Sequence, residues 1–83
     1  MFDYIRIGFL LERAAKCASE RKNEELTANF LAKAERLVHK SRLNIHEANA
    51  IITLYDRVII AAANPQGTIP IKEHCEEMKG FLR

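Results

Sequence analysis

No proline interrupts the chain before Pro65, and the second proline, Pro70, follows five residues later. Proline and glycine are the residues that most often end helices, and the 83 residues include three glycines and these two prolines. Long stretches without such residues favour helices over many short strands. The sequence therefore predicts an all-α fold, and its length predicts a single helical domain that spans residues 1–83.

The first two helices are predicted from apolar residues at helical spacing. The first helix begins near Asp3, which is a favourable N-cap, and a break is expected over residues 19–23. Asn23 then caps the second helix, and Glu24 and Glu25 lie in its first turn, where carboxylates suit the positive end of the helix dipole. The buried stripe predicted for this second helix consists of Leu26, Phe30, Leu31, Ala34, Leu37 and Val38.

The third helix has the strongest signals. Asn44 and Glu47 have the spacing of a capping box, and an unbroken apolar stripe follows until Asn64-Pro65 ends the helix. A shorter fourth helix follows Pro70, with Lys79 on its outer side, Gly80 as its C-cap and Phe81 folded back on the core. Together the patterns predict a compact bundle of three long helices and one short C-terminal helix.

Sequence motifs of catalytic and metal sites are missing. The chain has no glycine-rich phosphate loop, no Gly-x-Ser-x-Gly elbow, no His-Glu-x-x-His pair and no Cys-x-x-Cys pair. His74 and Cys75 are adjacent, but neighbouring side chains on a helix diverge by about 100° and do not form a dyad. We therefore expect a protein that is not an enzyme and that has no metal and no cofactor.

The cysteines and the apolar segments predict the compartment. Cys17 and Cys75 lie far apart at core spacing and are expected to be buried free thiols in a reducing cytosol. Residues 7–11 are apolar but too few for a signal peptide, and no segment approaches the ~20 apolar residues of a membrane span. The prediction is a soluble cytoplasmic protein.

A basic row is the most distinctive polar feature of the sequence. Lys33, Arg36 and Lys40 are spaced by three and four residues, so they lie on one side of the second helix, and Arg42 follows directly. The row is either a solvated helix face, a surface that steers a macromolecular partner, or a set of phosphate contacts. In the last case the third helix would act as a recognition helix that presents His46, Asn49, Thr53 and Arg57 to bases.

The first helix also has more apolar residues than one buried stripe needs. Phe2, Ile5 and Phe9 form a second apolar edge, and Leu54 and Ile60 widen the stripe of the third helix. These residues either face the short helix or mark a surface for a partner helix or for a second copy of the chain.

Function is predicted from these two surfaces. The favoured hypothesis is a small, non-catalytic protein-interaction module, a bacterial or phage accessory regulator or inhibitor that binds a protein partner of unknown identity. Phe2, Ile5 and Phe9 would contact the partner, while Lys33, Arg36, Lys40 and Arg42 would steer association, and a homodimer is a further option. The alternative is a nucleic-acid-binding helical protein that uses the segment Lys33–Arg42 on phosphates.

Overall fold

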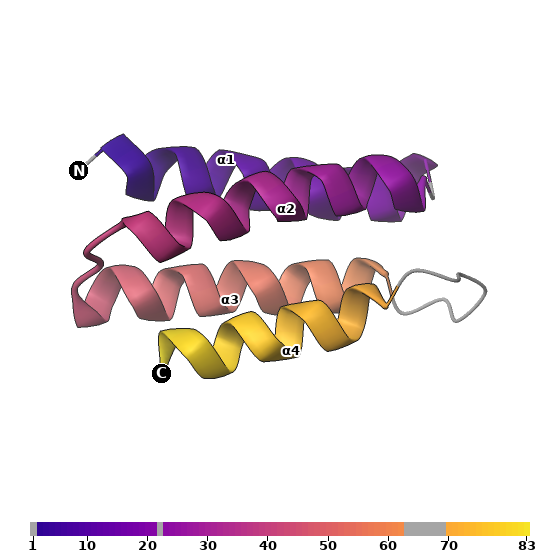
Figure 1. Ribbon diagram of the computed structural model, residues 1–83. Coiled ribbons are helices and arrows are strands. Elements are labelled where there is room, and N and C mark those ends of the chain that lie inside the picture. Colours follow the sequence, from indigo (N-terminus) through magenta and orange to yellow (C-terminus); the bar gives the residue numbers. More distant parts are fainter. Residues whose placement is uncertain (1, 22, 63–69) are drawn as a thin grey trace.

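Four α-helices make up most of the part of the chain that the structure describes (Figure 1). The computed structural model describes residues 2–21, 23–62 and 70–83, and the side chains of all of these except residues 2 and 21. The helices are α1 (Phe2–Lys16), α2 (Glu24–Lys40), α3 (Ile45–Ala61) and α4 (Ile71–Leu82), and a π-helical turn, η1 (Cys17–Arg21), continues α1. None of the described residues forms a strand. The predicted all-α bundle of three long helices and one short helix is confirmed.

The helices surround one core in a definite order. Successive helices run in opposite directions (Figure 1), α1 packs along both α2 and α3, and α3 also packs along α4. The backbones of α2 and α4 approach each other over a short stretch only, whereas α2 and α3 make no backbone contact within the described segments. The order around the bundle is therefore α2, α1, α3, α4. It follows that α2 and α3 are at opposite corners and that their outer faces point to opposite sides.

Each helix buries residues that alternate at spacings of four and three along the chain. This heptad spacing keeps one stripe of a helix against its neighbours and is typical of helices that cross at about 20° in bundles. Burial of one large aliphatic side chain contributes about 1.5–3 kcal/mol, so the stripes supply most of the stabilisation. The buried heptad residues are Ile7, Leu11, Ala14 and Ala18; Thr27, Leu31, Ala34 and Val38; Ala48, Ile51, Tyr55 and Val58; and Ile71, Cys75 and Met78.

The two predicted asparagine caps are present. The Asn44 side chain accepts a hydrogen bond from the backbone N–H of Glu47 at 2.8 Å, and the Glu47 carboxylate accepts one from the backbone N–H of Asn44 at 3.1 Å. This is the capping box predicted from the sequence. The Asn23 side chain accepts from the backbone N–H of Leu26 at 3.1 Å. Both caps satisfy amide groups that the first turn of a helix leaves without partners.

The stripe of α2 differs in part from its prediction. Three of its six predicted members are buried, whereas Leu26, Phe30 and Leu37 are half-buried on the side of the helix next to the stripe. Thr27 takes a buried position instead, and its hydroxyl donates a hydrogen bond to the Asn23 carbonyl at 2.8 Å. Since this bond satisfies the hydroxyl, a polar side chain is tolerated in the core at the start of α2.

The ends of three elements differ from the sequence predictions. α1 already begins at Phe2, so Asp3 lies in its first turn and is not its N-cap. Much of the break expected over residues 19–23 is the π-helical turn η1. α4 continues through Gly80 to Leu82, and Phe81 is 57 % exposed because the heptad of α4 turns it toward α2 and not into the core. The predicted stop at Asn64-Pro65 lies outside the described residues.

Candidate functional site

Ile5 and Phe9 form an exposed apolar pair on α1. They are one helical turn apart on the side opposite the buried stripe, and 52 % of Ile5 and 61 % of Phe9 are exposed. Phe2 precedes them at the same kind of spacing, but its side chain is outside the described set. An exposed aromatic ring beside an exposed isoleucine is the type of patch that marks interaction surfaces when it is contiguous.

The apolar residues that were expected to widen α3 do not extend this patch. Leu54 is half-buried against α1, where a Cβ atom added to Gly8 would lie 3.8 Å from the Leu54 Cδ1 atom. Ile60 is 73 % exposed and lies on the outer face of α3, away from α1. The pair on α1 and Ile60 are thus two separate features.

The predicted basic row on α2 is exposed. Lys33, Arg36, Lys40 and Arg42 are all exposed, and none of the four has an ion pair within 4.0 Å among the described residues. Their spacing places the first three along one line on the outer side of the helix. The structure therefore presents these three as unneutralised cations on a single helix face, with Arg42 just beyond its end.

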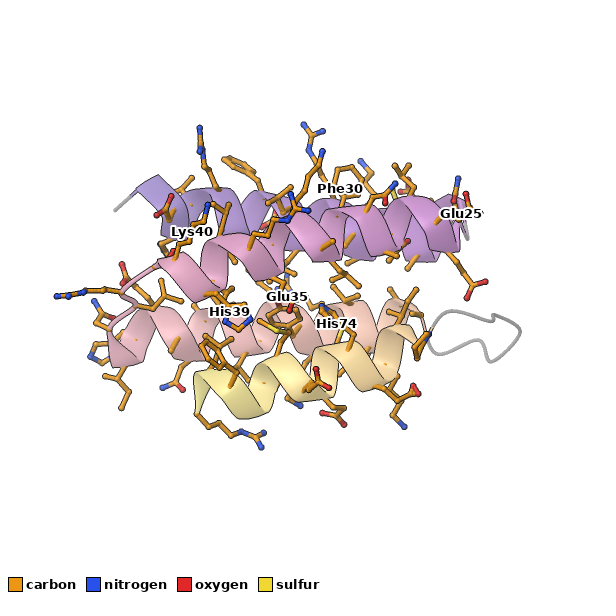
Figure 2. All side chains as sticks on the ribbon, in the orientation of Figure 1. Glu25, Phe30, Glu35, His39, Lys40 and His74 are labelled. Carbon is orange, nitrogen blue, oxygen red and sulfur yellow. The ribbon has the colours of Figure 1, made fainter. Side chains whose placement is uncertain are left out.

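The α1–α2 hairpin brings the basic row beside the apolar pair. Positions equally far from the connection of two antiparallel helices lie level with each other, so Phe9 is level with Arg36 and Arg13 is nearly level with Lys33. Sequence reasoning had not included the exposed cations of α1, Arg6 and Arg13. Figure 2 shows nitrogen-tipped side chains along the outer side of this hairpin. We call this surface the basic-apolar face; it consists of Ile5, Arg6, Phe9, Arg13, Lys33, Arg36 and Lys40.

Charge is distributed unequally along the chain. Residues 1–42 contain nine lysines and arginines against six aspartates and glutamates, whereas residues 43–83 contain four against five. In the second half Lys79, which was expected on the outer side, is only 13 % exposed and pairs with Asp56 and with Glu76. These hydrogen bonds raise the pKa of Lys79, chiefly through Asp56. The positive potential of the molecule is therefore concentrated on the α1–α2 hairpin.

A polar cluster lies on the opposite flank of α2, where this helix faces α4. Figure 2 shows Glu35 between His39 and His74. The Nε2 atom of His39 is 3.5 Å from one carboxylate oxygen of Glu35, and the Nε2 atom of His74 is 3.8 Å from the other. The His39 ring also contacts the Phe81 ring edge-on, with ring centroids 4.5 Å apart. Sequence reasoning missed this cluster because residues 35 and 74 meet only through the packing of α4.

Two buried groups lie next to this cluster. Tyr55 and Cys75 are fully buried, and burial raises the pKa of both, that of Cys75 to about 12. The Cys75 thiol is therefore protonated at neutral pH. The Tyr55 hydroxyl and the His74 Nε2 atom are buried and have no hydrogen-bond partner among the described residues. Cys75 is the buried free thiol expected from the sequence, whereas Cys17 is half-buried.

A cavity of about 250 Å³ opens between α2 and α4 beside the polar cluster. Its walls are mostly apolar, and the Glu35 carboxylate and the His74 ring provide its polar end. The lining residues are Ala28, Leu31, Ala32, Glu35, Pro70, Ile71 and His74. The described part of the chain holds no group of three or more His, Cys, Asp or Glu side chains that is arranged to bind a metal ion.

The third helix presents the side chains that the nucleic-acid hypothesis requires, but on the other side of the molecule. His46, Asn49, Thr53 and Arg57 are exposed on α3. Since α2 and α3 are at opposite corners, these side chains and the basic row point in opposite directions. A single duplex therefore cannot contact both surfaces at once.

None of the helices over the described residues is both long enough and apolar enough to cross a membrane. Comparison of the chain with protein-family models, with curated proteins and with solved structures gives no match.

Proposed function

We propose that this protein is a non-catalytic helical interaction module that binds an acidic protein partner through the basic-apolar face. The proposal rests on one observation: Ile5 and Phe9 are exposed beside cations of α1 and α2 that have no ion pair among the described residues. Aromatic anchors with arginines beside them are enriched where interfaces gain most of their binding energy. Action as a regulator or inhibitor would follow from occlusion of the partner's own binding surface.

The charge of the face selects the kind of partner. Cations beside an apolar pair, without ion pairs among the described residues, favour a protein surface that has carboxylates next to an apolar patch, because complementary charges speed up association and orient the two proteins. A symmetric homodimer through this face would place like charges against each other, which disfavours it. A reducing cytoplasm is the compartment we propose, since both cysteines are free thiols.

The test of the proposal is capture of a partner by variants of the tagged protein. Phe9→Ser is expected to weaken binding by about 2 kcal/mol, or roughly thirtyfold, because it removes the aromatic anchor. Ile60→Ser is the matched control, since it removes an exposed apolar side chain from the opposite side of the bundle. Both variants should keep their stability within about 0.5 kcal/mol. Equal loss of the partner by both variants, or by neither, would contradict the proposed face.

Charge reversal tests the role of the basic row. The triple variant Lys33→Glu, Arg36→Glu, Lys40→Glu should slow association by about tenfold or more at low salt, with a smaller effect on dissociation. Reversal of Lys72, an exposed lysine of α4, serves as the control. An unchanged association rate in the triple variant would show that the row does not steer binding.

The nucleic-acid alternative is kept because Lys33, Arg36 and Lys40 form a straight row that has no ion pairs with other described residues. It makes a different prediction: the logarithm of the affinity for a duplex would fall with the logarithm of salt concentration with a slope of about −0.9 for each phosphate contacted. Capture before and after nuclease treatment separates the two hypotheses. A partner that survives nuclease and depends on Phe9 supports the interaction module, whereas loss of all bound material on digestion supports the alternative.

A further inference from the structure

The cavity between α2 and α4 has one apolar part and one polar end. Ala28, Leu31, Ala32 and Ile71 line the apolar part, and the Glu35 carboxylate lies at the polar end beside His74. With a volume of about 250 Å³ the cavity is smaller than the 300–1,000 Å³ of pockets for drug-sized ligands. Its size and walls therefore suit a short hydrocarbon chain with one polar group.

The charge at the polar end determines which polar group fits. The ion-pair partners of Glu35 among the described residues are two imidazoles, at 3.5 Å and 3.8 Å, and no lysine or arginine of the described residues lies within 4.0 Å of its carboxylate. The lysines and arginines of the basic row are on the outer side of α2, whereas Glu35 is on the flank that faces α4. The Glu35 side chain is 41 % exposed, so its carboxylate is a negative charge at the open end of the cavity, which favours a cation there.

An unpartnered polar atom at the same place gives an independent indication. His74 belongs to the cavity lining, and its Nε2 atom is buried and has no hydrogen-bond partner in the described segments. Buried polar atoms of folded proteins normally have partners, and such exceptions often mark sites for a further group.

We propose that the α2–α4 cavity is a binding site for a primary alkylammonium group, with the ammonium at Glu35 and His74 and the hydrocarbon chain against Leu31 and Ile71. The ammonium supplies three hydrogen-bond donors, and the polar end of the cavity offers acceptors. The group is either a free short-chain amine or the side chain of a lysine, which has the same butylammonium end. This site is independent of the basic-apolar face, because the two are on different flanks of α2.

The test is a titration of the 83-residue chain with n-butylammonium chloride. Amide chemical shifts in two-dimensional NMR spectra, recorded at each ligand concentration, report binding. We expect saturable shifts at residues 28–35 and 71–75, with a dissociation constant on the order of 10 mM, as is usual for a ligand of five non-hydrogen atoms. n-Butanol has the same hydrocarbon chain without the charge and should bind at least about tenfold more weakly. Equal binding of the alcohol and the amine would overturn the proposal.

Two variants locate the site. Glu35→Gln keeps the shape of the side chain and removes its charge, so it should weaken n-butylammonium binding by about tenfold. Glu25→Gln is the matched control, because Glu25 is an exposed carboxylate in the first turn of the same helix (Figure 2). Ala32→Leu adds bulk at an exposed lining position and should abolish the shifts without unfolding the core. Binding that is unchanged in both Glu35→Gln and Ala32→Leu would also overturn the proposal.

The source of the ammonium is distinguished by a second probe. Nα-acetyl-lysine N-methylamide carries the lysine side chain with peptide bonds on both sides. If it binds as tightly as n-butylammonium, the site accepts a lysine from a peptide. If only the free amine binds, the site takes a small molecule. Both results support the alkylammonium site, and the absence of saturable shifts with either probe would contradict it.

Discussion

The α1–α2 pair and the α3–α4 pair use the same heptad spacing, yet they differ in how their charged side chains are partnered and in the size of the side chains that they bury. Both pairs expose large apolar side chains. The first pair leaves its outer cations without ion pairs among the described residues, and its buried layers contain small residues such as Ala14 and Ala34. The second pair buries a tyrosine and a cysteine and covers Lys79 with carboxylates. Both pairs thus contribute a buried stripe to the core, and the first pair differs in presenting a row of cations, without ion pairs among the described residues, beside exposed apolar side chains.

The difference shows that the heptad positions determine how the helices pack. The positions that flank the heptad stripe determine which charged and apolar side chains each surface exposes. Phe9 on α1 and Ile60 on α3 are both exposed, but only Phe9 has a row of cations beside it. Similarly, Glu35 and Glu25 belong to the same helix, and only Glu35 faces a neighbouring helix. Function in a bundle this small therefore depends on residues next to the stripe.

The largest expected effect concerns the core of the second pair. Tyr55→Ala should lower the free energy of unfolding by about 3–5 kcal/mol, because it leaves a cavity where a fully buried ring was. Tyr55→Phe should instead raise it by up to about 1 kcal/mol, since the hydroxyl has no hydrogen-bond partner among the described residues. Urea denaturation measures both. A loss of more than about 1 kcal/mol in Tyr55→Phe would show that the hydroxyl is satisfied in solution.

Alkaline pH should lower the stability of the folded protein through a buried thiol of the α3–α4 pair. Burial raises the pKa of Cys75 from 9.0 to about 12, so above pH 9 the unfolded chain loses this proton while the folded protein keeps it. Stability is therefore unaffected by this thiol well below pH 9 and falls between pH 9 and pH 12, by up to about 1.4 kcal/mol per pH unit.

Denaturation curves at several pH values check this prediction. The buried hydroxyl of Tyr55 adds a loss of the same sign at higher pH, because burial raises its pKa as well. Cys75→Ala should remove the part of the fall in unfolding free energy that begins near pH 9. Cys17→Ala changes the half-buried cysteine and should leave that part of the fall unchanged. Identical slopes in both variants would mean that the Cys75 thiol is not protected by the fold.

The smallest expected effect is the loss of stability on removal of a helix N-cap, with one cap taken from each helix pair. Asn44→Ala removes one hydrogen bond of the capping box and should lower the free energy of unfolding by about 1–2 kcal/mol, and Asn23→Ala, with a single side-chain bond, by about 1 kcal/mol. Aspartate at either position should keep most of the stability because its oxygen accepts the same bond. Loss of helicity and of stability is measured by circular dichroism during thermal unfolding.

Local signals in the sequence were sufficient for the helices but not for the sites between them. The capping box at Asn44 and the stripe of α3 follow from residues within one helix, and they were predicted from spacing alone. The contact of Glu35 with His74, the covered position of Lys79 and the exposure of Phe81 each depend on which side of α4 meets α2 or α3. That information lies in the packing order, which periodicity does not specify.

The way α4 is attached has a consequence for local unfolding. α4 begins after Pro70 without a side-chain cap, packs mainly on α3 and approaches the backbone of α2 only briefly. Detachment of this one helix would leave α1, α2 and α3 packed together, so α4 is expected to open as a separate unit at a lower free energy than global unfolding. Amide hydrogens of α4 would then exchange with solvent before those of α3. Each opening would also expose Cys75, so the labelling rate of this thiol would report how often the bundle opens on that side.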